Sequence, residues 1–260
     1  VLNSAQNNPK FIRLLEYSLN SIDNFISPPN TEVRINAKIL MQKGGIDILK
    51  DIALKNKDNE EVVNHIIDIV FKLTSIYNAI DNELAQQFID SNGHKAVMDL
   101  LIKKQKGPSS LPLFKTLNGL VKVPHLINCM LASGLIDTMK QINDLYTDDI
   151  GAISINFDTL LKVSNQKIGR EMIVKKGACP FILQNIKTAL DFNDVHAVPV
   201  GLSIINNVCR LDEGKRAMKE ADVANILCQV VDNFNGNEII LNKTAKIFAK
   251  IFSKADFYKE

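Results

Sequence analysis

The sequence lacks the features that define several large protein classes. Its 260 residues include no tryptophan and only 6% aromatic residues, and no apolar run approaches the roughly 18 residues that a membrane-spanning helix needs. Lysine and arginine (31) almost balance aspartate and glutamate (29), so the chain has no strong field of the kind that attracts nucleic acids. It also has no glycine-rich phosphate-binding motif and no G-x-S-x-G nucleophile motif. We therefore predict a folded, non-catalytic protein with no nucleic-acid partner and no membrane span.

The cysteines and histidines show no spacing that indicates a metal site or a disulfide framework. They are Cys129, Cys179, Cys209 and Cys228, and His65, His94, His125 and His196. No CxxC pair occurs and each cysteine lies in an apolar helical stretch, which predicts buried, reduced thiols. The histidines have no metal-ligand spacing, so we predict that they lie on helix surfaces or at helix ends. No metal or other cofactor is predicted.

The first residues give no targeting signal. The segment VLNSAQNNPKF has neither the charged region nor the apolar region of a signal peptide. Because the chain begins with Val1 rather than methionine, we expect a natural N-terminus, with any lipidation signal that it carries, to lie upstream.

One pattern recurs along the chain and organises the rest of the sequence. A short helix breaks at a glycine and a second helix follows, as around Gly177. Similar breaks occur at Gly44, Gly93 and Gly134, with Asp222 in the equivalent place. The intervals of 49, 41, 43 and 45 residues indicate a repeat of about 42 residues with loops of varying length. The chain turns sharply at each break, so we predict a positive φ there, which glycine adopts freely and aspartate tolerates.

A third, longer helix is predicted after each of these pairs. The clearest example has apolar residues at spacings of three and four, including Ile240, Ile247 and Ile251. The predicted third helices span about 60–78, 111–123, 149–163, 194–210 and 237–253. A lone helix at 9–27 is predicted to cap the N-terminal end of the stack. The resulting repeats span about 32–79, 80–122, 123–164, 165–210 and 211–255.

These repeats resemble the armadillo family over nearly the whole chain. The resemblance rests on a short helix, a glycine break after an apolar segment and two longer helices, all within about 42 residues. It implies a single all-α domain over residues 1–260, a right-handed α-solenoid of about five three-helix repeats with an N-terminal capping helix. HEAT repeats are the nearest alternative, but they use two helices and lack the glycine break.

The armadillo resemblance also implies a concave groove lined by the third helices, where an asparagine near each helix end holds the backbone of an extended peptide. The positions fifteen residues before each break, with their counterpart in the last repeat, are Asn78, Gly119, Lys162, Asn207 and Lys250. One turn earlier lie Thr74, Lys115, Asp158, Ser203 and Lys246, and neighbouring amides are Asn118 and Asn206. Because only two clamp positions are asparagine, we predict weak clamping of a peptide backbone. The missing tryptophan argues against a nuclear-import receptor.

This predicted groove carries more lysine than acid. Its charged residues are Lys115, Lys162, Lys246 and Lys250 against Asp158. Such a surface favours an acidic or phosphorylated segment of a partner protein. The alternative is that these lysines only keep the surface soluble.

Two functions from different classes follow. The first is a cytoplasmic scaffold or adaptor that holds a partner protein in the groove or on its outer helices. The second is a membrane-docked tether, because a chain made only of repeats and rich in asparagine, lysine and isoleucine is similar to the armadillo-repeats-only proteins of apicomplexan parasites. That resemblance implies a lipid-anchored protein on the cytosolic face of the rhoptry, which recruits a myosin motor or a signalling enzyme to position the organelle. A chaperone cofactor or a GTPase regulator built on the same repeats is a third reading.

Overall fold

A computed structural model of the chain describes residues 9–27, 32–76, 79–103, 110–146 and 149–252. The chain forms two compact units, Val1–Ser133 (unit 1) and Gly134–Glu260 (unit 2), which are described one at a time. The boundary between them falls inside the third predicted repeat, between its first and second helices. Within the described ranges, no helix has both the length and the apolar content that crossing a membrane requires.

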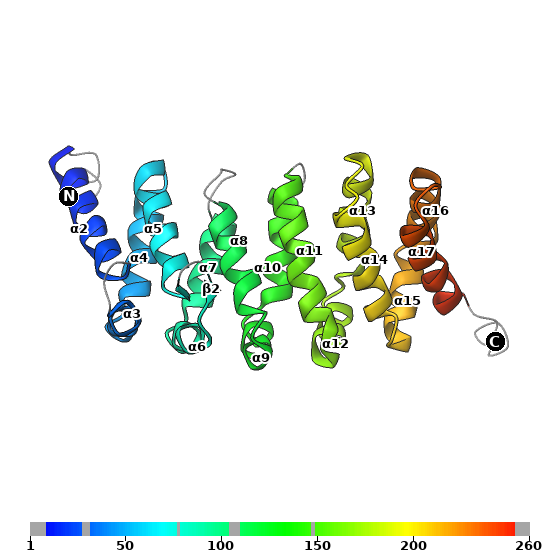
Figure 1. Ribbon diagram of the computed structural model, residues 1–260, viewed down its shortest axis with the longest axis horizontal. Helices are drawn as coiled ribbons and strands as arrows, with labels where there is room; N and C mark the ends of the chain where they lie inside the picture. Colours follow the sequence, from blue (N-terminus) through cyan, green and yellow to red (C-terminus); the bar gives the residue numbers. More distant parts are fainter. Residues whose placement is uncertain (1–8, 28–31, 77–78, 104–109, 147–148, 253–260) are drawn as a thin grey trace. The chain divides into compact units, whose positions relative to one another are not determined.

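Unit 1 starts with the lone helix α2 (Pro9–Phe25) and continues with helices in sets of three. The first set is α3 (Val33–Gln42), α4 (Gly45–Lys55) and α5 (Glu60–Lys72). The second is α6 (Asn82–Asp90), α7 (Gly93–Lys103) and α8 (Ser110–Leu120), and α9 (Pro124–Ala132) follows. Equivalent helices pack on one another: α3 contacts α6, α4 contacts α7, and α5 contacts both α2 and α8 (Figure 1).

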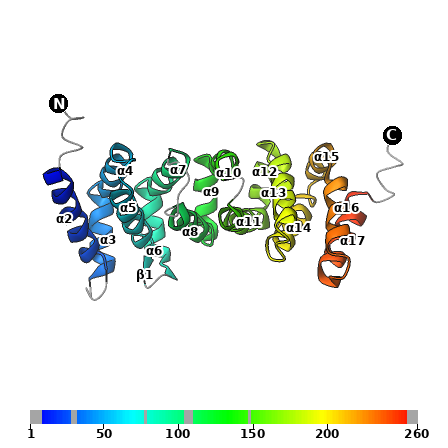
Figure 2. The same cartoon turned by 90° about the horizontal axis from the view of Figure 1, so that it is seen from above.

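Unit 2 continues the same alternation. It contains α10 (Leu135–Leu145) and α11 (Ile150–Asn165), then α12 (Lys167–Lys175), α13 (Cys179–Asp191) and α14 (Ala197–Val208), and finally α15 (Asp212–Glu220), α16 (Val223–Asn233) and α17 (Glu238–Ile251). The first helices α12 and α15 are in contact, as are the second helices α13 and α16. The third helices α11, α14 and α17 follow one another along the unit (Figure 2).

The backbone enters the left-handed region between the first and second helices, as predicted from the breaks. The φ angles are 75°, 93°, 59° and 63° at Gly44, Gly134, Gly177 and Asp222. The prediction for Gly93 was wrong, because Asn92 takes this conformation (φ 57°) and Gly93 is the first residue of α7. Asparagine tolerates the left-handed region because its short amide forms local hydrogen bonds.

Side-chain caps start the third helices at regular places. Asn59, Asp149 and Asn237 each accept a hydrogen bond from the backbone N–H three residues later, at 3.0 to 3.2 Å. Asp194 does the same before α14, where its Oδ1 accepts from the N–H groups of His196 and Ala197. The first N–H groups of a helix have no partner inside the helix, so these caps decide where each one begins. They also give a common origin for comparing positions in different third helices.

The third helix of the first set is shorter than predicted. It ends at Lys72 instead of near Asn78, and two short antiparallel strands follow, β1 (Ser75–Ile76) and β2 (Ala79–Ile80). The backbone N–H of Asp81 then donates to the carbonyl of Thr74 at 3.1 Å, which closes this hairpin. The hairpin lies inside the longest interval between breaks, from Gly44 to Asn92.

Candidate protein-binding surface

Four of the third helices carry a polar side chain at an equivalent place on the helix. Counting nine residues from the caps gives the ledge residues, which are Asp68, Asp158, Ser203 and Lys246. Ser203 is half-buried and the other three are exposed, whereas the neighbouring apolar residues, such as Leu202 and Ile204, are buried in the core. A fixed distance from the helix start puts each ledge residue on the same side of its own helix. The ledge is therefore the side of these helices that a partner can reach.

Residues thirteen positions from the caps connect the helices to one another instead. In unit 1, Lys72 Nζ of α5 lies 2.6 Å from Asp23 Oδ1 of α2. In unit 2, Lys250 Nζ of α17 donates to the carbonyl of Asn206 at 2.6 Å and to its Oδ1 at 3.0 Å. Lys72 reaches back to the lone helix α2 and Lys250 reaches back to the third helix α14, so the ammonium groups of both already have partners within the protein.

Asn207, which was predicted to bind a partner's backbone, belongs to this group. Its side-chain amide donates to Ser164 Oγ at 3.1 Å and to Asn165 Oδ1 at 2.9 Å, and the residue is only 6% exposed. The prediction that Asn207 is an exposed binding residue was therefore wrong. The amide ties α14 to the end of α11.

We expect Asn207→Ala to lower the free energy of unfolding by about 1 to 2 kcal/mol, because it removes two hydrogen bonds, one of them to the buried Ser164, and leaves a small cavity between α14 and α11. Urea unfolding followed by circular dichroism measures this loss. The matched control is Asn242→Ala on α17, which truncates an exposed asparagine and should change stability by less than about 0.5 kcal/mol. Equal stability of the two variants would show that the amide contributes nothing to joining the helices.

The hairpin after α5 displaces another predicted groove residue. Thr74 is fully buried and its hydroxyl donates to the carbonyl of Phe71 at 2.9 Å, so it does not line a groove. Asn78 lies outside the described residues. Counting fifteen residues back from the next break therefore does not find the groove residues of this repeat. The hairpin adds residues between the end of α5 and that break, so the count stops short of the helix. Asp68 and Lys72 occupy the equivalent places.

In unit 1 the exposed residues on the third helices carry charges of both signs. Lys115 of α8 is exposed and Asn118 is half-buried, while Asp68 of α5 is exposed. The pattern of buried residues around Lys115 matches that around Ser203, with Thr116 and Leu117 in the core. Asp68 and Lys115 carry opposite charges, so the third helices of unit 1 have no excess of positive charge on this exposed side.

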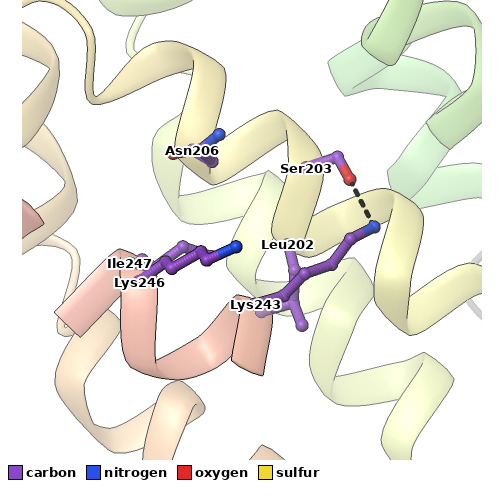
Figure 3. Close-up of a pocket in the computed structure, with 6 residues that line it drawn as sticks. All are labelled: Leu202, Ser203, Asn206, Lys243, Lys246 and Ile247. Carbon is purple, nitrogen blue, oxygen red and sulfur yellow. Dashed lines mark hydrogen bonds between the residues drawn. The ribbon is translucent and has the colours of Figure 1, made fainter. Parts of the chain in front are cut away.

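In unit 2 the last two third helices form a small pocket with lysines around it. The pocket has a volume of about 70 Å³ and is lined by Leu202, Ser203, Asn206, Lys243, Lys246 and Ile247 (Figure 3). Lys243 Nζ donates to Ser203 Oγ at 3.0 Å and to the carbonyl of Pro199 at 3.3 Å. Lys246 is exposed and makes no hydrogen bond or ion pair with the residues that the structure describes. Its ammonium group is free to bind a partner.

Further basic residues surround the neighbouring Lys250. Partial burial is the main reason that the pKa of Lys250 lies below its usual value. Arg210, Lys215 and Arg170 lower this pKa further by repulsion, against an opposing effect from Cys209. Lys162 of α11 is half-buried and Asp158, four residues earlier, is exposed. This end of unit 2 thus gathers positive charge from several elements.

The cysteines and histidines match their predictions only in part. Cys179 and Cys209 are buried, and burial raises the pKa of these thiols to about 11 and about 12, but Cys129 and Cys228 are exposed. His65 is half-buried and His125 and His196 are exposed, whereas His94 is buried, contrary to its predicted surface position. Among the described residues, no three acidic, histidine or cysteine side chains come together as a metal site.

Comparison with known proteins bears on the fold alone. No protein-family model matches the chain, and no curated protein is similar to it in sequence. Among solved structures, it is similar to the designed armadillo repeat protein YIII(Dq)4CqI, with a TM-score of 0.63 at 14% identity over 96% of this chain and 98% of that one. It is also similar to a second engineered protein, with a TM-score of 0.62 at 13% identity over 91% and 97% of the two chains. The fold is therefore all-α and built from armadillo-type repeats, as the glycine breaks and three-helix sets indicate.

Proposed function

We propose that the chain is a non-catalytic scaffold that binds an acidic segment of a partner protein along α14 and α17 of unit 2. The observation that carries this proposal is the free ammonium group of Lys246 beside the pocket between these helices. Helix α17 contributes two more lysines, Lys243 and Lys250, and α14 has no acidic residue. Armadillo-type folds commonly act as protein-binding scaffolds, which supports the general role.

The geometry favours a carboxylate flanked by an apolar group. Lys246 can donate up to three hydrogen bonds to carboxylate oxygens, and such charge-assisted bonds are stronger than neutral ones. Leu202 and Ile247 supply apolar walls for the stem of the acidic side chain. Lys243 and Lys250 are held in place by bonds to α14, so they add positive potential without needing to move.

The proposal can be tested with a fluorescein-labelled poly-glutamate peptide as the probe, measured by fluorescence anisotropy. Lys246→Glu should weaken binding about tenfold, because it replaces an attractive charge with a repulsive one. Binding by the wild-type chain should also weaken as salt is raised.

The matched control is Lys187→Glu, which makes the same charge change at an exposed lysine on the second helix α13. It should bind the peptide almost as the wild type does. If both variants lose affinity equally, binding responds to net charge alone and the pocket has no role. If the wild-type chain does not bind the peptide, the acidic-segment proposal fails.

We also keep the partition into five repeats within one solenoid as a proposal, supported by the recurring sets of three helices. The predicted roles as a rhoptry tether for a myosin motor or signalling enzyme, as a chaperone cofactor and as a GTPase regulator stay predictions. Each depends on a partner or an anchor that no described residue identifies. The same holds for the predicted cytoplasmic location.

A further inference from the structure

Four basic side chains gather in unit 2, where α14 contacts α12, α15 and α17. We call them the basic cluster: Arg170 of α12, Arg210 just after α14, Lys215 of α15 and Lys250 of α17. Besides burial, repulsion from the other three lowers the pKa of Lys250, so all four lie close together. Positive charge from four separate places in the sequence therefore reaches one place in the fold.

Hydrogen bonds hold two members of the basic cluster in position. Arg170 Nη1 donates to the carbonyl of Asn165 at 3.0 Å, at the end of α11. Asn165 Oδ1 in turn accepts from the amide of Asn207, whose neighbour Asn206 accepts two bonds from Lys250 Nζ. These bonds fix Arg170 and Lys250 on adjoining parts of the unit. Neither cation has to be ordered when a ligand binds, which favours affinity.

Most of the charge of the basic cluster has no counter-charge. Lys215 pairs with Asp212 at 3.0 Å, but Arg170, Arg210 and Lys250 form no ion pair with the residues that the structure describes. The guanidinium group of Arg210 is exposed and makes no hydrogen bond with those residues either. The Nε–H of Arg170 is buried and also lacks a partner within the described ranges. Cations that keep free donors and lack counter-charge attract an anion.

A phosphoryl group matches this cluster better than a carboxylate does. It carries a charge of about −1.5 to −2 at pH 7 and three acceptor oxygens, so it can interact with several cations at once. Guanidinium groups such as that of Arg210 also bind phosphate through two parallel hydrogen bonds. A carboxylate offers one charge and two oxygens, and it would leave more of the repulsion within the cluster uncompensated.

The basic cluster lies within reach of the proposed acidic segment. Lys250 follows Lys246 by four residues on α17, so the two lie on the same side of the helix, about 6 Å apart along its axis. An extended chain covers this distance in about two residues. A segment that places a carboxylate at Lys246 can therefore place a second anionic side chain at the basic cluster.

We propose that the basic cluster binds a phosphorylated serine or threonine of the partner segment, about two residues from the acidic side chain that Lys246 binds. This inference rests on the proposed function and narrows its acidic segment to a phosphorylated one. Arg210 contacts the phosphoryl group directly, while Arg170 and Lys250 add positive potential from fixed positions. Because Arg170 and Lys250 also stabilise the ends of α11 and α14, Arg210 is the residue at which binding and stability can be separated.

Fluorescence anisotropy with two peptides tests the proposal. Both are fluorescein-labelled glutamate peptides of equal length, one with phosphoserine and the other with glutamate at its middle position. The wild type should bind the phosphoserine peptide at least about tenfold more tightly. Arg210→Ala should reduce this preference to less than about threefold. Arg210→Lys should keep part of it, because lysine retains the charge but not the paired hydrogen bonds.

The matched control is Arg216→Ala, at an exposed arginine of α15 that directly follows Lys215 and so points to another side of the helix. It should keep the full preference for phosphoserine. Lys246→Glu should weaken the binding of both peptides and leave the preference intact, because the preference comes from the basic cluster. Thermal melts by circular dichroism should be the same for Arg210→Ala and the wild type, since the side chain forms no hydrogen bond with the described residues.

Three results would overturn this inference and leave the acidic-segment proposal standing. One is equal affinity of the wild type for the two peptides. Another is a preference for phosphoserine that Arg210→Ala retains, which would place the phosphoryl group elsewhere. The third is flotation of the chain with phosphatidylcholine vesicles that contain phosphatidylinositol phosphate, without a preference for the phosphoserine peptide, which would assign the cluster to a lipid headgroup. A wild-type chain that binds neither peptide would contradict both proposals.

Discussion

Replacing Gly169 by alanine is expected to lower the free energy of unfolding by about 3 kcal/mol. Gly169 is buried in α12, where the helix starts against the end of α11. An added Cβ would lie 2.0 Å from the carbonyl oxygen of Val163 and 2.8 Å from its Cγ1. A backbone oxygen cannot rotate away as a flexible side chain does, so the two helices must separate. That separation opens the core on both sides.

The next repeat contains the same contact. Gly214 of α15 lies 45 residues after Gly169, and an added Cβ there would lie 2.1 Å from the carbonyl oxygen of Val208, which lies 45 residues after Val163. We expect Gly214→Ala to destabilise the chain by a similar amount. Recurrence in two repeats indicates that the close approach is part of the repeat's packing in unit 2.

A control separates crowding from backbone strain. Gly177 has a φ of 59°, but an added Cβ would meet nothing within 4 Å. Gly177→Ala should therefore cost only the left-handed backbone penalty, about 1 kcal/mol. Urea unfolding at 222 nm compares the variants. If Gly169→Ala destabilises the chain no more than Gly177→Ala, the helices have room to adjust and the crowding argument is wrong.

Local signals in the sequence predicted most of the fold. Breaks at Gly44 and Gly134 mark where the first helices end, and Asn237 marks where a third helix starts, because both features follow from backbone chemistry within a few residues. The apolar spacing of Ile240, Ile247 and Ile251 correctly indicated the buried face of α17. Such features do not depend on contacts with distant parts of the chain.

Other features depend on contacts that only the fold creates. Asn92, rather than the adjacent Gly93, takes the left-handed conformation, although glycine is the usual choice. Gly93 instead keeps α7 close to Phe88, where an added Cβ would lie 2.6 Å from the ring. A glycine can serve either a left-handed turn or the close packing of a helix against a neighbouring side chain. The sequence alone does not show which of these two roles a given glycine has.

The candidate site was predicted less well, for a related reason. The sequence places Asn207 near the end of a third helix but does not tell whether its amide faces a partner or the preceding helix, because both need the same residue type. Because the sequence does not reveal the hairpin after α5, counting back from the next break led to the buried Thr74 instead of the exposed Asp68. Lys246 is exposed, as a binding residue must be, but its contact with a partner stays a prediction.

Lowering the pH from about 7.5 to 4.5 is expected to cost the folded chain about 2 to 3 kcal/mol through His94 alone. His94 of α7 is only 3% exposed, and its Nε2 lies 2.8 Å from Ser133 Oγ. Its Nδ1 is buried and has no hydrogen-bond partner among the described residues, so a protonated ring would leave one N–H group unsatisfied. Burial, with a smaller effect from Lys95, lowers the pKa of His94 from 6.5 to about 4.

The sign follows from which state binds the proton. Between pH 6.5 and 4 the unfolded chain holds a proton on His94 that the folded chain excludes, so acid favours unfolding in this window. Above pH 6.5 both states carry a neutral ring, and the full stability is present. Below about pH 4 both are protonated and His94 causes no further loss.

The experiment compares the pH dependence of urea unfolding in the wild type, His94→Leu and Ser133→Ala. His94→Leu should lose about 2 to 3 kcal/mol less than the wild type between pH 7.5 and 4.5, because the titrating group is gone. Ser133→Ala should be less stable at all pH values yet keep the wild-type pH dependence, because it removes the hydrogen bond and retains the buried ring. If the free energy of unfolding of His94→Leu falls with pH as steeply as that of the wild type, other groups cause the loss of stability in acid. The buried ring of His94 would then not be responsible for it.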